Sequence, residues 1–145
     1  MKENEVKENK NLVGVYGSLR EGMGNYFHFL DNDQSTLLGD FKTEPKYTMV
    51  SLGGFPGLYK EGDTSILVEV FEVTDTIFRR LDGLEGYNPN NPQNSMYIRE
   101  QIETPYGDAW IYIYNGSGVS TGSTIVESGD WVEFRNAITN AYQRV

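Results

Sequence analysis

The sequence of 145 residues lacks cysteine and contains a single histidine, His28. Without cysteine, the chain can form neither a disulfide framework nor a metal site built on thiolates. A Ser-His-Asp mechanism or an imidazole metal ligand would have to use His28, which has no second histidine with which to share a metal. The composition therefore predicts no metal site and favours a packed or surface position for His28.

Basic residues are also scarce: 12 Lys and Arg stand against 21 Asp and Glu, so the formal net charge is −9. This balance argues against a nucleic-acid footprint, which needs clustered Lys and Arg to neutralise phosphates. No apolar run approaches the roughly 20 residues of a membrane span, and the N-terminus lacks the apolar core of a signal peptide. We therefore expect a cytoplasmic protein that binds neither nucleic acid nor membranes, with an oligomeric state that the sequence leaves open.

The length suits one domain with a substantial core. Residues 1–11 are almost entirely polar and are expected to form a flexible tail, which leaves 12–145 as the domain. Apolar alternation predicts strands, and capped amphipathic patterns predict helices. The expected strands cover residues 12–15, 41–52, 65–73, 97–103 and 109–114, and the expected helices begin at Asn25, at Thr74 and near Asp130. In the clearest strand, 65–73, the alternation places Glu69 on a partly apolar face.

The first strand runs into the turn Tyr16-Gly17-Ser18-Leu19. Glycine permits a positive φ or a close approach of the backbone to a ligand, and successive amide N–H groups in such a turn can converge on an anion. The Ser18 hydroxyl both donates and accepts hydrogen bonds. The turn is therefore a candidate seat for a carboxylate or a developing oxyanion, with an ordinary tight turn as the alternative.

Glu85 is the most suggestive acid of the chain. It lies between Gly83 and Gly86, where the sequence indicates the end of an amphipathic helix. Glycines leave the backbone free to turn the carboxylate inward, whereas a glutamate on a helix face usually stays in solvent. The sequence leaves open whether the Glu85 carboxylate turns inward or stays in solvent.

Two further segments are candidate walls of a pocket. Phe55 lies in a loop with three glycines and a proline, which is either a strand connection or a surface offered to a ligand. Tyr97 and Arg99 share one face of a strand, and that face either looks into a cavity or is exposed with Arg99 paired to an acid. Residues 88–95 could form a flap, and the Gly/Ser-rich residues 115–123 are expected to be a mobile connection.

Six short motifs, taken together, resemble one known family. In chain order they are Tyr16-Gly17-Ser18-Leu19, Phe55-Pro56-Gly57, Leu81-Asp82-Gly83-Leu84-Glu85-Gly86, Tyr97-x-Arg99, Ala109-Trp110-x-Tyr112 and Ser128-Gly129-Asp130-Trp131. Their order and spacing are similar to the gamma-glutamylcyclotransferase-like superfamily, and particularly to its short gamma-glutamylamine cyclotransferase-like branch. The resemblance runs from Leu12 to Trp131.

The resemblance implies an α+β fold, a small mixed β-barrel flanked by a few short helices. It also implies an enzyme that cyclises a γ-glutamyl amine or γ-glutamyl amino acid to 5-oxoproline and releases the amine. Glu85 stands at the position of the family's catalytic acid/base. Tyr16, Gly17, Ser18, Leu19, Phe55, Tyr97 and Arg99 would then bind the small-molecule substrate. This chemistry needs neither metal nor nucleotide cofactor.

The sequence departs from the family pattern at Val68, where many members carry glycine, and in the polar segment 88–94, which is longer than usual. A valine could change the depth of the pocket, and a long flap could change the choice of substrate. A non-catalytic module that uses the same cavity to bind a small molecule or a partner segment is the alternative function.

Overall fold

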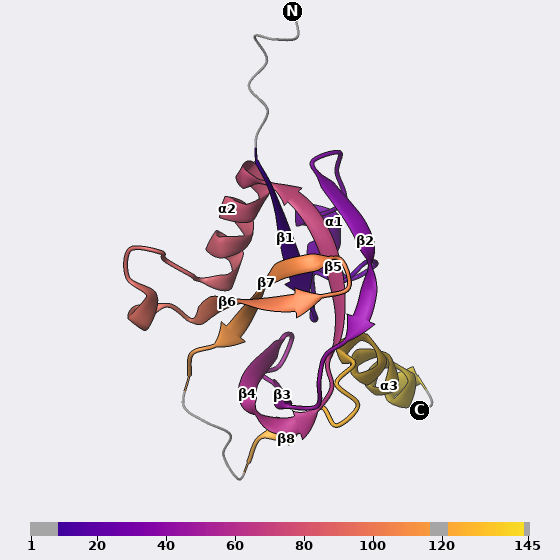
Figure 1. The fold of residues 1–145 in the computed structure, drawn as a ribbon. Helices are drawn as coiled ribbons and strands as arrows, with labels where there is room; N and C mark the ends of the chain where they lie inside the picture. The colour runs from indigo at the N-terminus through magenta and orange to yellow at the C-terminus, as the bar shows by residue number, and fades with distance from the viewer. Residues whose placement is uncertain (1–8, 117–121, 144–145) are drawn as a thin grey trace, which may run out of the picture.

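A computed structural model describes residues 9–116 and 122–143 of the chain. In these ranges, strands and helices combine in one α+β arrangement (Figure 1). The elements are β1 (Lys10–Val15), α1 (Gly24–Phe29), β2 (Ser35–Lys42), β3 (Tyr47–Ser51), β4 (Pro56–Thr64), β5 (Leu67–Thr74), α2 (Asp75–Glu85), the 3₁₀ turn η2 (Pro92–Asn94), β6 (Tyr97–Thr104), β7 (Gly107–Tyr114), β8 (Thr124–Ile125) and α3 (Trp131–Gln143). The first strand begins inside the predicted tail, most of which lies outside the described residues, as does most of the Gly/Ser-rich connection.

The strands form two sheets. A five-stranded sheet has the order β2-β5-β1-β7-β6, and a three-stranded sheet has the order β4-β3-β8. Only β1 and β7 pair in parallel among the described strands, so the larger sheet is mixed. The predicted α+β class is correct, but the barrel is not: within the described ranges no ladder joins the edge strands β2 and β6, and no strand of the smaller sheet pairs with a strand of the larger.

Each face of the five-stranded sheet is covered by a separate apolar cluster. Val68 and Val70 point toward the small sheet and Trp131 of α3, and Phe71 and Val73 point toward α1 and α2. This alternation on β5 is the one that the sequence predicts for a strand buried on both faces. The two clusters meet at the end of β1, where Tyr16 belongs to one of them and Val15 to the other.

The helix α2 begins and ends with residues suited to those positions. The Thr74 side chain accepts a hydrogen bond from the Ile77 N–H at the N-terminus, and Gly86 closes the helix in the left-handed conformation with φ 64°. The helix therefore continues through Glu85, which the sequence places just past its end. Gly83 lies within the last turn of the helix, and Gly86 is the residue that ends the helix.

Two other expectations need correction. Asn25 does not cap the first helix, since Met23 is the N-cap and Asn25 lies within α1. The predicted strand 41–52 is two strands, β2 and β3, separated around Pro45, whose ring removes a backbone donor. The 88–95 segment contains the 3₁₀ turn η2, and none of its residues lines the cavity described below, so a flap there stays a prediction. Among the helices that the structure describes, none is long and apolar enough to cross a membrane.

Candidate active site

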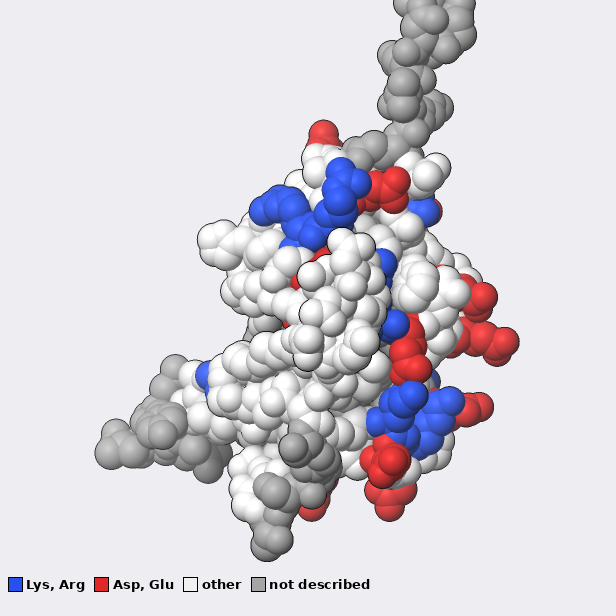
Figure 2. Space-filling view, turned by 90° about the vertical axis from the view of Figure 1, so that its left-hand side faces the viewer, with Lys and Arg blue, Asp and Glu red and all other residues white. Residues whose placement is uncertain are grey.

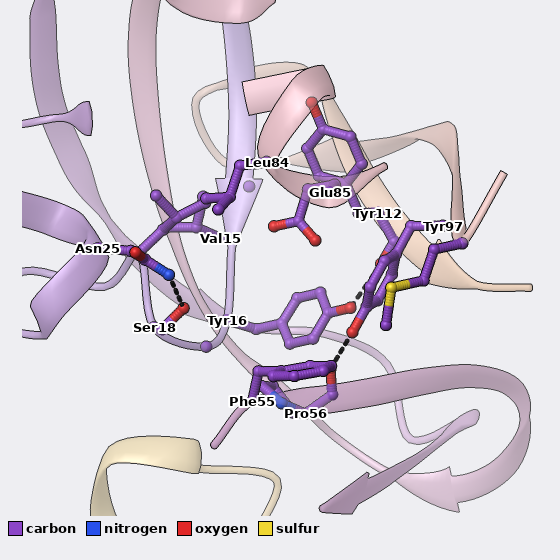
Figure 3. Close-up of a pocket in the computed structure, with 14 residues that line it drawn as sticks. Val15, Tyr16, Ser18, Asn25, Phe55, Pro56, Leu84, Glu85, Tyr97 and Tyr112 are labelled. Carbon is purple, nitrogen blue, oxygen red and sulfur yellow. Dashed lines mark hydrogen bonds between the residues drawn. The ribbon is translucent and has the colours of Figure 1, made fainter. Parts of the chain in front are cut away.

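A cavity of about 270 Å³ opens where four segments meet: the end of β1, the loop before β4, the last turn of α2 and the start of β6. Figure 3 shows the side chains that surround it. The lining residues are Gly14, Val15, Tyr16, Gly17, Ser18, Leu19, Asn25, Phe55, Pro56, Leu84, Glu85, Met96, Tyr97 and Tyr112. The cavity thus contains both features that the sequence singles out, the glycine turn and Glu85.

The turn after β1 presents free donors to the cavity. No hydrogen bond within the described residues uses the backbone N–H groups of Gly17, Ser18 or Leu19. The Ser18 carbonyl accepts from the N–H groups of Asn25 and Tyr26 at 3.1 and 3.2 Å, and its hydroxyl accepts from the Asn25 side-chain amide at 2.7 Å. The start of α1 therefore holds the turn in place, and the unused N–H groups remain available for an anion.

Gly17 is required for a reason other than its φ, which is not positive. A Cβ at Gly17 would lie 2.7 Å from Cδ of Pro56, closer than real side chains approach. The absence of a side chain thus lets the turn pack directly on the Phe55-Pro56 loop. Similarly, a Cβ at Gly14 would lie 2.9 Å from Cγ1 of Val68, so the unusual valine lies behind Gly14 and does not itself line the cavity.

A buried ionic cluster fixes the other end of the turn. Arg20 is 7% exposed; its Nε lies 3.0 Å from a Glu69 oxygen, and its Nη1 lies 2.6 Å from Asp130. The second Glu69 oxygen accepts a hydrogen bond from the backbone N–H of Glu21 at 2.6 Å. Burial raises the pKa of Asp130, but hydrogen bonds from Arg20 and from the Glu133 N–H outweigh it, and the net pKa lies below its usual range.

Glu85 has no such partner. No hydrogen bond or ion pair among the described residues involves its carboxyl group, which points into the middle of the cavity above the ring of Tyr16 (Figure 3). The residue keeps some contact with solvent through the opening, but burial of the carboxyl raises its pKa from 4.5 to about 7. A carboxyl group with this pKa can accept and return a proton near neutral pH.

Three tyrosines surround Glu85, and each donates its hydroxyl proton elsewhere. The Tyr16 hydroxyl donates to the Tyr112 carbonyl at 2.6 Å, Tyr97 to the Pro56 carbonyl at 2.6 Å, and Tyr112 to Asp82 at 2.7 Å. Burial, with the nearby Glu85 charge as a smaller cause, raises the pKa of all three phenols. They therefore stay neutral, bring aromatic surface to the cavity, and leave the Glu85 charge without a donor.

Arg99 does not line the cavity. Its guanidinium lies 4.2 Å from the ring centre of Phe78 and 5.0 Å from that of Trp110, and one nitrogen lies 3.3 Å from Asp82. Asp82 is the acid that also accepts the hydroxyl proton of Tyr112. The structure therefore combines parts of both predicted alternatives: Tyr97 lines the cavity, whereas Arg99 pairs with an acid but is not exposed, with 17% of its side chain accessible. Arg99 is connected to the cavity through Asp82 and Tyr112.

Of the predicted site residues, all except Arg99 meet at this cavity. Sequence reasoning does not assign to the site the lining residues Gly14, Val15, Asn25, Pro56, Met96 and Tyr112. The pattern around Asn25 indicates a helix cap, and Met96 follows a polar loop that gives no periodic signal. In the described part of the chain, no group of three or more His, Asp or Glu side chains could hold a metal ion.

Similarity to known proteins identifies the family of this chain. The family model described as "Gamma-glutamyl cyclotransferase, AIG2-like" matches residues 13–133. The chain belongs to the gamma-glutamylcyclotransferase family. It is 38% identical over 121 residues to the gamma-glutamylcyclotransferase family protein YtfP of Escherichia coli K12, covering 83% of this chain and 96% of that one.

A further relative and a solved structure of YtfP are also similar to this gamma-glutamylcyclotransferase family member over most of their lengths. A Vibrio cholerae protein is 40% identical over 124 residues, covering 86% of this chain and 97% of its own length. The solution structure of E. coli YtfP superposes with a TM-score of 0.61 at 32% identity, covering 86% of this chain and 98% of that chain. The family resemblance inferred from the short motifs is thus confirmed.

Proposed function

We propose that this protein cyclises a γ-glutamyl amine or γ-glutamyl amino acid to 5-oxoproline and releases the amine, with Glu85 as general base and then general acid. The observation that carries the proposal is a carboxyl group with a pKa of about 7 in a cavity that also presents unused backbone donors. Family membership supports the reaction class.

The reaction needs no external nucleophile. Glu85 takes a proton from the substrate's α-ammonium group, and the freed nitrogen lone pair forms a bond to the γ-carbonyl carbon. The carbonyl oxygen becomes an oxyanion. When it collapses, the bond to the leaving nitrogen breaks and Glu85 gives its proton to that nitrogen. The ring nitrogen loses its second proton to the released amine, which departs as an ammonium ion. Atoms balance without water, since the lactam and the amine together contain all atoms of the substrate.

The turn supplies the electrostatic part of this proposal. The N–H groups of Gly17, Ser18 and Leu19 would hold either the substrate's α-carboxylate or the oxyanion. Tyr16 and Tyr97 would shape the folded substrate so that its amine lies against its γ-carbonyl. The rate enhancement would then come from the orientation of the substrate and from proton transfer by one carboxyl group, that of Glu85.

The test compares wild type with Glu85→Gln on a panel of γ-glutamyl amines and γ-glutamyl amino acids, with 5-oxoproline followed by mass spectrometry. We expect turnover to fall by about 10²–10⁴-fold in Glu85→Gln, the range that a general acid/base contributes, with substrate affinity little changed. Leu38→Gln, a change on exposed β2 outside the cavity, is the matched control and should keep wild-type turnover. Absence of 5-oxoproline from folded wild type with every substrate would refute the proposal and favour a binding module.

A further inference from the structure

The opening of the cavity is apolar. Phe55, Leu84 and Met96 line it while remaining 39%, 37% and 44% exposed. They come from three different elements: the loop before β4, the last turn of α2 and the residue before β6. Exposed large apolar side chains are few in the described residues, and three of the seven lie around this one opening. Such a gathering marks a surface that a ligand covers.

The same cavity has almost no charge. Among its lining residues, all of them in the described part of the chain, Glu85 is the only carboxylic acid and there is no Lys, Arg or His. Arg20, next to the turn, and Arg99, on β6, are paired with acids and do not line it. Arg135 donates to the Gly53 carbonyl at 3.4 Å, two residues before Phe55, and does not line the cavity either. Figure 2 views the molecule from the side of α2, and the middle of this face carries few charged side chains, which gather at the upper and right-hand edges.

The polar groups are inside and fix how a substrate lies. The free N–H groups of the turn can donate hydrogen bonds to one anion. Glu85 must face the α-amine and the γ-carbonyl of the substrate. A γ-glutamyl group has one carboxylate, which the turn can hold. The leaving amine is attached on the opposite side of the γ-carbonyl and must therefore face the rim of Phe55, Leu84 and Met96.

Resting on the proposed function, we infer that the preferred substrates are γ-glutamyl amides whose leaving amine is apolar and uncharged beyond the reacting nitrogen. A second carboxylate on the leaving amine would lose water at this rim and find no cation. A terminal ammonium would lose water as well, against three apolar side chains. Desolvating an unpaired charge costs far more than the apolar contact that replaces its water.

Two matched pairs of substrates test this. γ-Glutamyl-isopentylamide and γ-glutamyl-leucine share one branched carbon skeleton and differ by a carboxylate. γ-Glutamyl-butylamide and γ-glutamyl-putrescine differ by a terminal ammonium. In each pair we expect kcat/KM for the neutral member to be at least about tenfold higher, a discrimination typical of sites that leave a polar group unpaired.

A cation placed on the rim should change the preference. In Met96→Lys we expect the ratio of kcat/KM for γ-glutamyl-leucine to that for γ-glutamyl-isopentylamide to rise at least about fivefold. Ile125→Lys makes the same change at an exposed apolar residue of β8 outside the cavity, and its ratio should equal that of wild type.

The outcomes separate two kinds of failure. If wild type turns over the charged member of either pair as fast as the neutral one, the inference about the leaving amine is wrong and the proposed reaction stands. An unchanged ratio in folded Met96→Lys would also overturn the inference, because the rim would then not contact the leaving amine. If no substrate of either pair yields 5-oxoproline, the proposed function and the inference fall together.

Discussion

Glu69 and Glu85 are both carboxylates removed from bulk water, and they differ in what lies beside them. Glu69 is 8% exposed, and its two oxygens contact the Arg20 guanidinium and a backbone N–H. Glu85 lies among apolar and aromatic side chains without a cation or donor. The first carboxylate has its charge satisfied and links β5 to the turn. The second has an unsatisfied charge, and for that reason its proton is exchangeable near neutral pH.

The comparison distinguishes a buried carboxylate with a structural role, Glu69, from one with a proposed chemical role, Glu85. The Arg20 cluster joins three elements, because Asp130 precedes α3 and Glu69 belongs to β5. It positions the turn, which lines the cavity and whose N–H groups make no hydrogen bond within the described residues. Glu85 contributes nothing of this kind, and its burial without a partner is a cost in folding free energy that a catalytic role would explain.

Removing the cation of the paired region should have the largest effect on stability. In Arg20→Ala, Glu69 and Asp130 lose their common partner, and we expect the free energy of unfolding at pH 7 to fall by about 3–5 kcal/mol. Urea denaturation measures it. Lys60→Ala is the matched control, because the Lys60–Glu100 ion pair at 3.0 Å is exposed to solvent and should be worth 0 to about 1 kcal/mol. Equal losses in the two variants would show that the buried cluster is no more important than a surface pair.

Neutralising Glu85 should have a smaller effect of opposite sign. Its pKa is about 7 in the folded protein and 4.5 when the side chain is fully solvated, as in the unfolded chain, so folding favours the protonated form. The destabilisation therefore appears as pH rises from about 4.5 to 7, and it is complete above 7. Because one pKa unit corresponds to about 1.4 kcal/mol, we expect Glu85→Gln to raise the free energy of unfolding at pH 8 by about 1–3 kcal/mol.

At pH 4 this gain should disappear, since the carboxyl is then largely protonated in both states. Glu69→Gln provides the contrast, because loss of its contact with Arg20 should lower stability at pH 8. Urea denaturation at both pH values gives the comparison. A Glu85→Gln variant that is less stable than wild type at pH 8 would mean that Glu85 has a stabilising partner.

A cation next to Glu85 should stabilise its ionised carboxylate slightly, because it supplies the kind of charged partner that Glu69 has in Arg20. Wild-type kcat/KM is expected to fall about tenfold per pH unit below about 7, because the general base becomes protonated. In Leu84→Lys the new ammonium lies on the cavity rim and favours the ionised carboxylate, so this acidic limb should shift down by a few tenths of a pH unit. Leu38→Lys, on exposed β2, should leave the limb in place. An unshifted limb in Leu84→Lys would exclude Glu85 as the titrating base.

Local patterns predict those features that depend on neighbouring residues. Thr74 caps α2 at its N-terminus, and β5 alternates between two apolar faces, as the sequence indicates. Closure of the sheet is not predictable in this way, because pairing of distant strands leaves no local pattern. The barrel expectation comes from resemblance, and the absence of a ladder between β2 and β6 corrects it for the described residues.

The candidate site likewise contains some residues that local patterns predict and others that only distant contacts bring together. Glu85 and the turn are recognisable from glycines and motif order. Tyr97 and Arg99 are correctly assigned to one strand face, but residues two apart in a strand are separated by about 6.6 Å, enough to place one in the cavity and the other under α2. Asn25 and Met96 reach the cavity only through tertiary contacts.

The parallel pairing of β1 with β7 has a consequence for the order in which the chain folds. Val13 pairs with Trp110, the Tyr16 hydroxyl reaches a carbonyl 96 positions along the chain, and Arg20 reaches Asp130 across 110 positions. Closing such long loops is slow and entropically costly, so these contacts form after the local hairpins. During synthesis, Arg20 leaves the ribosome 110 residues ahead of Asp130, so the turn acquires its final surroundings only after Asp130 has emerged. The cavity is therefore assembled in the last steps of folding.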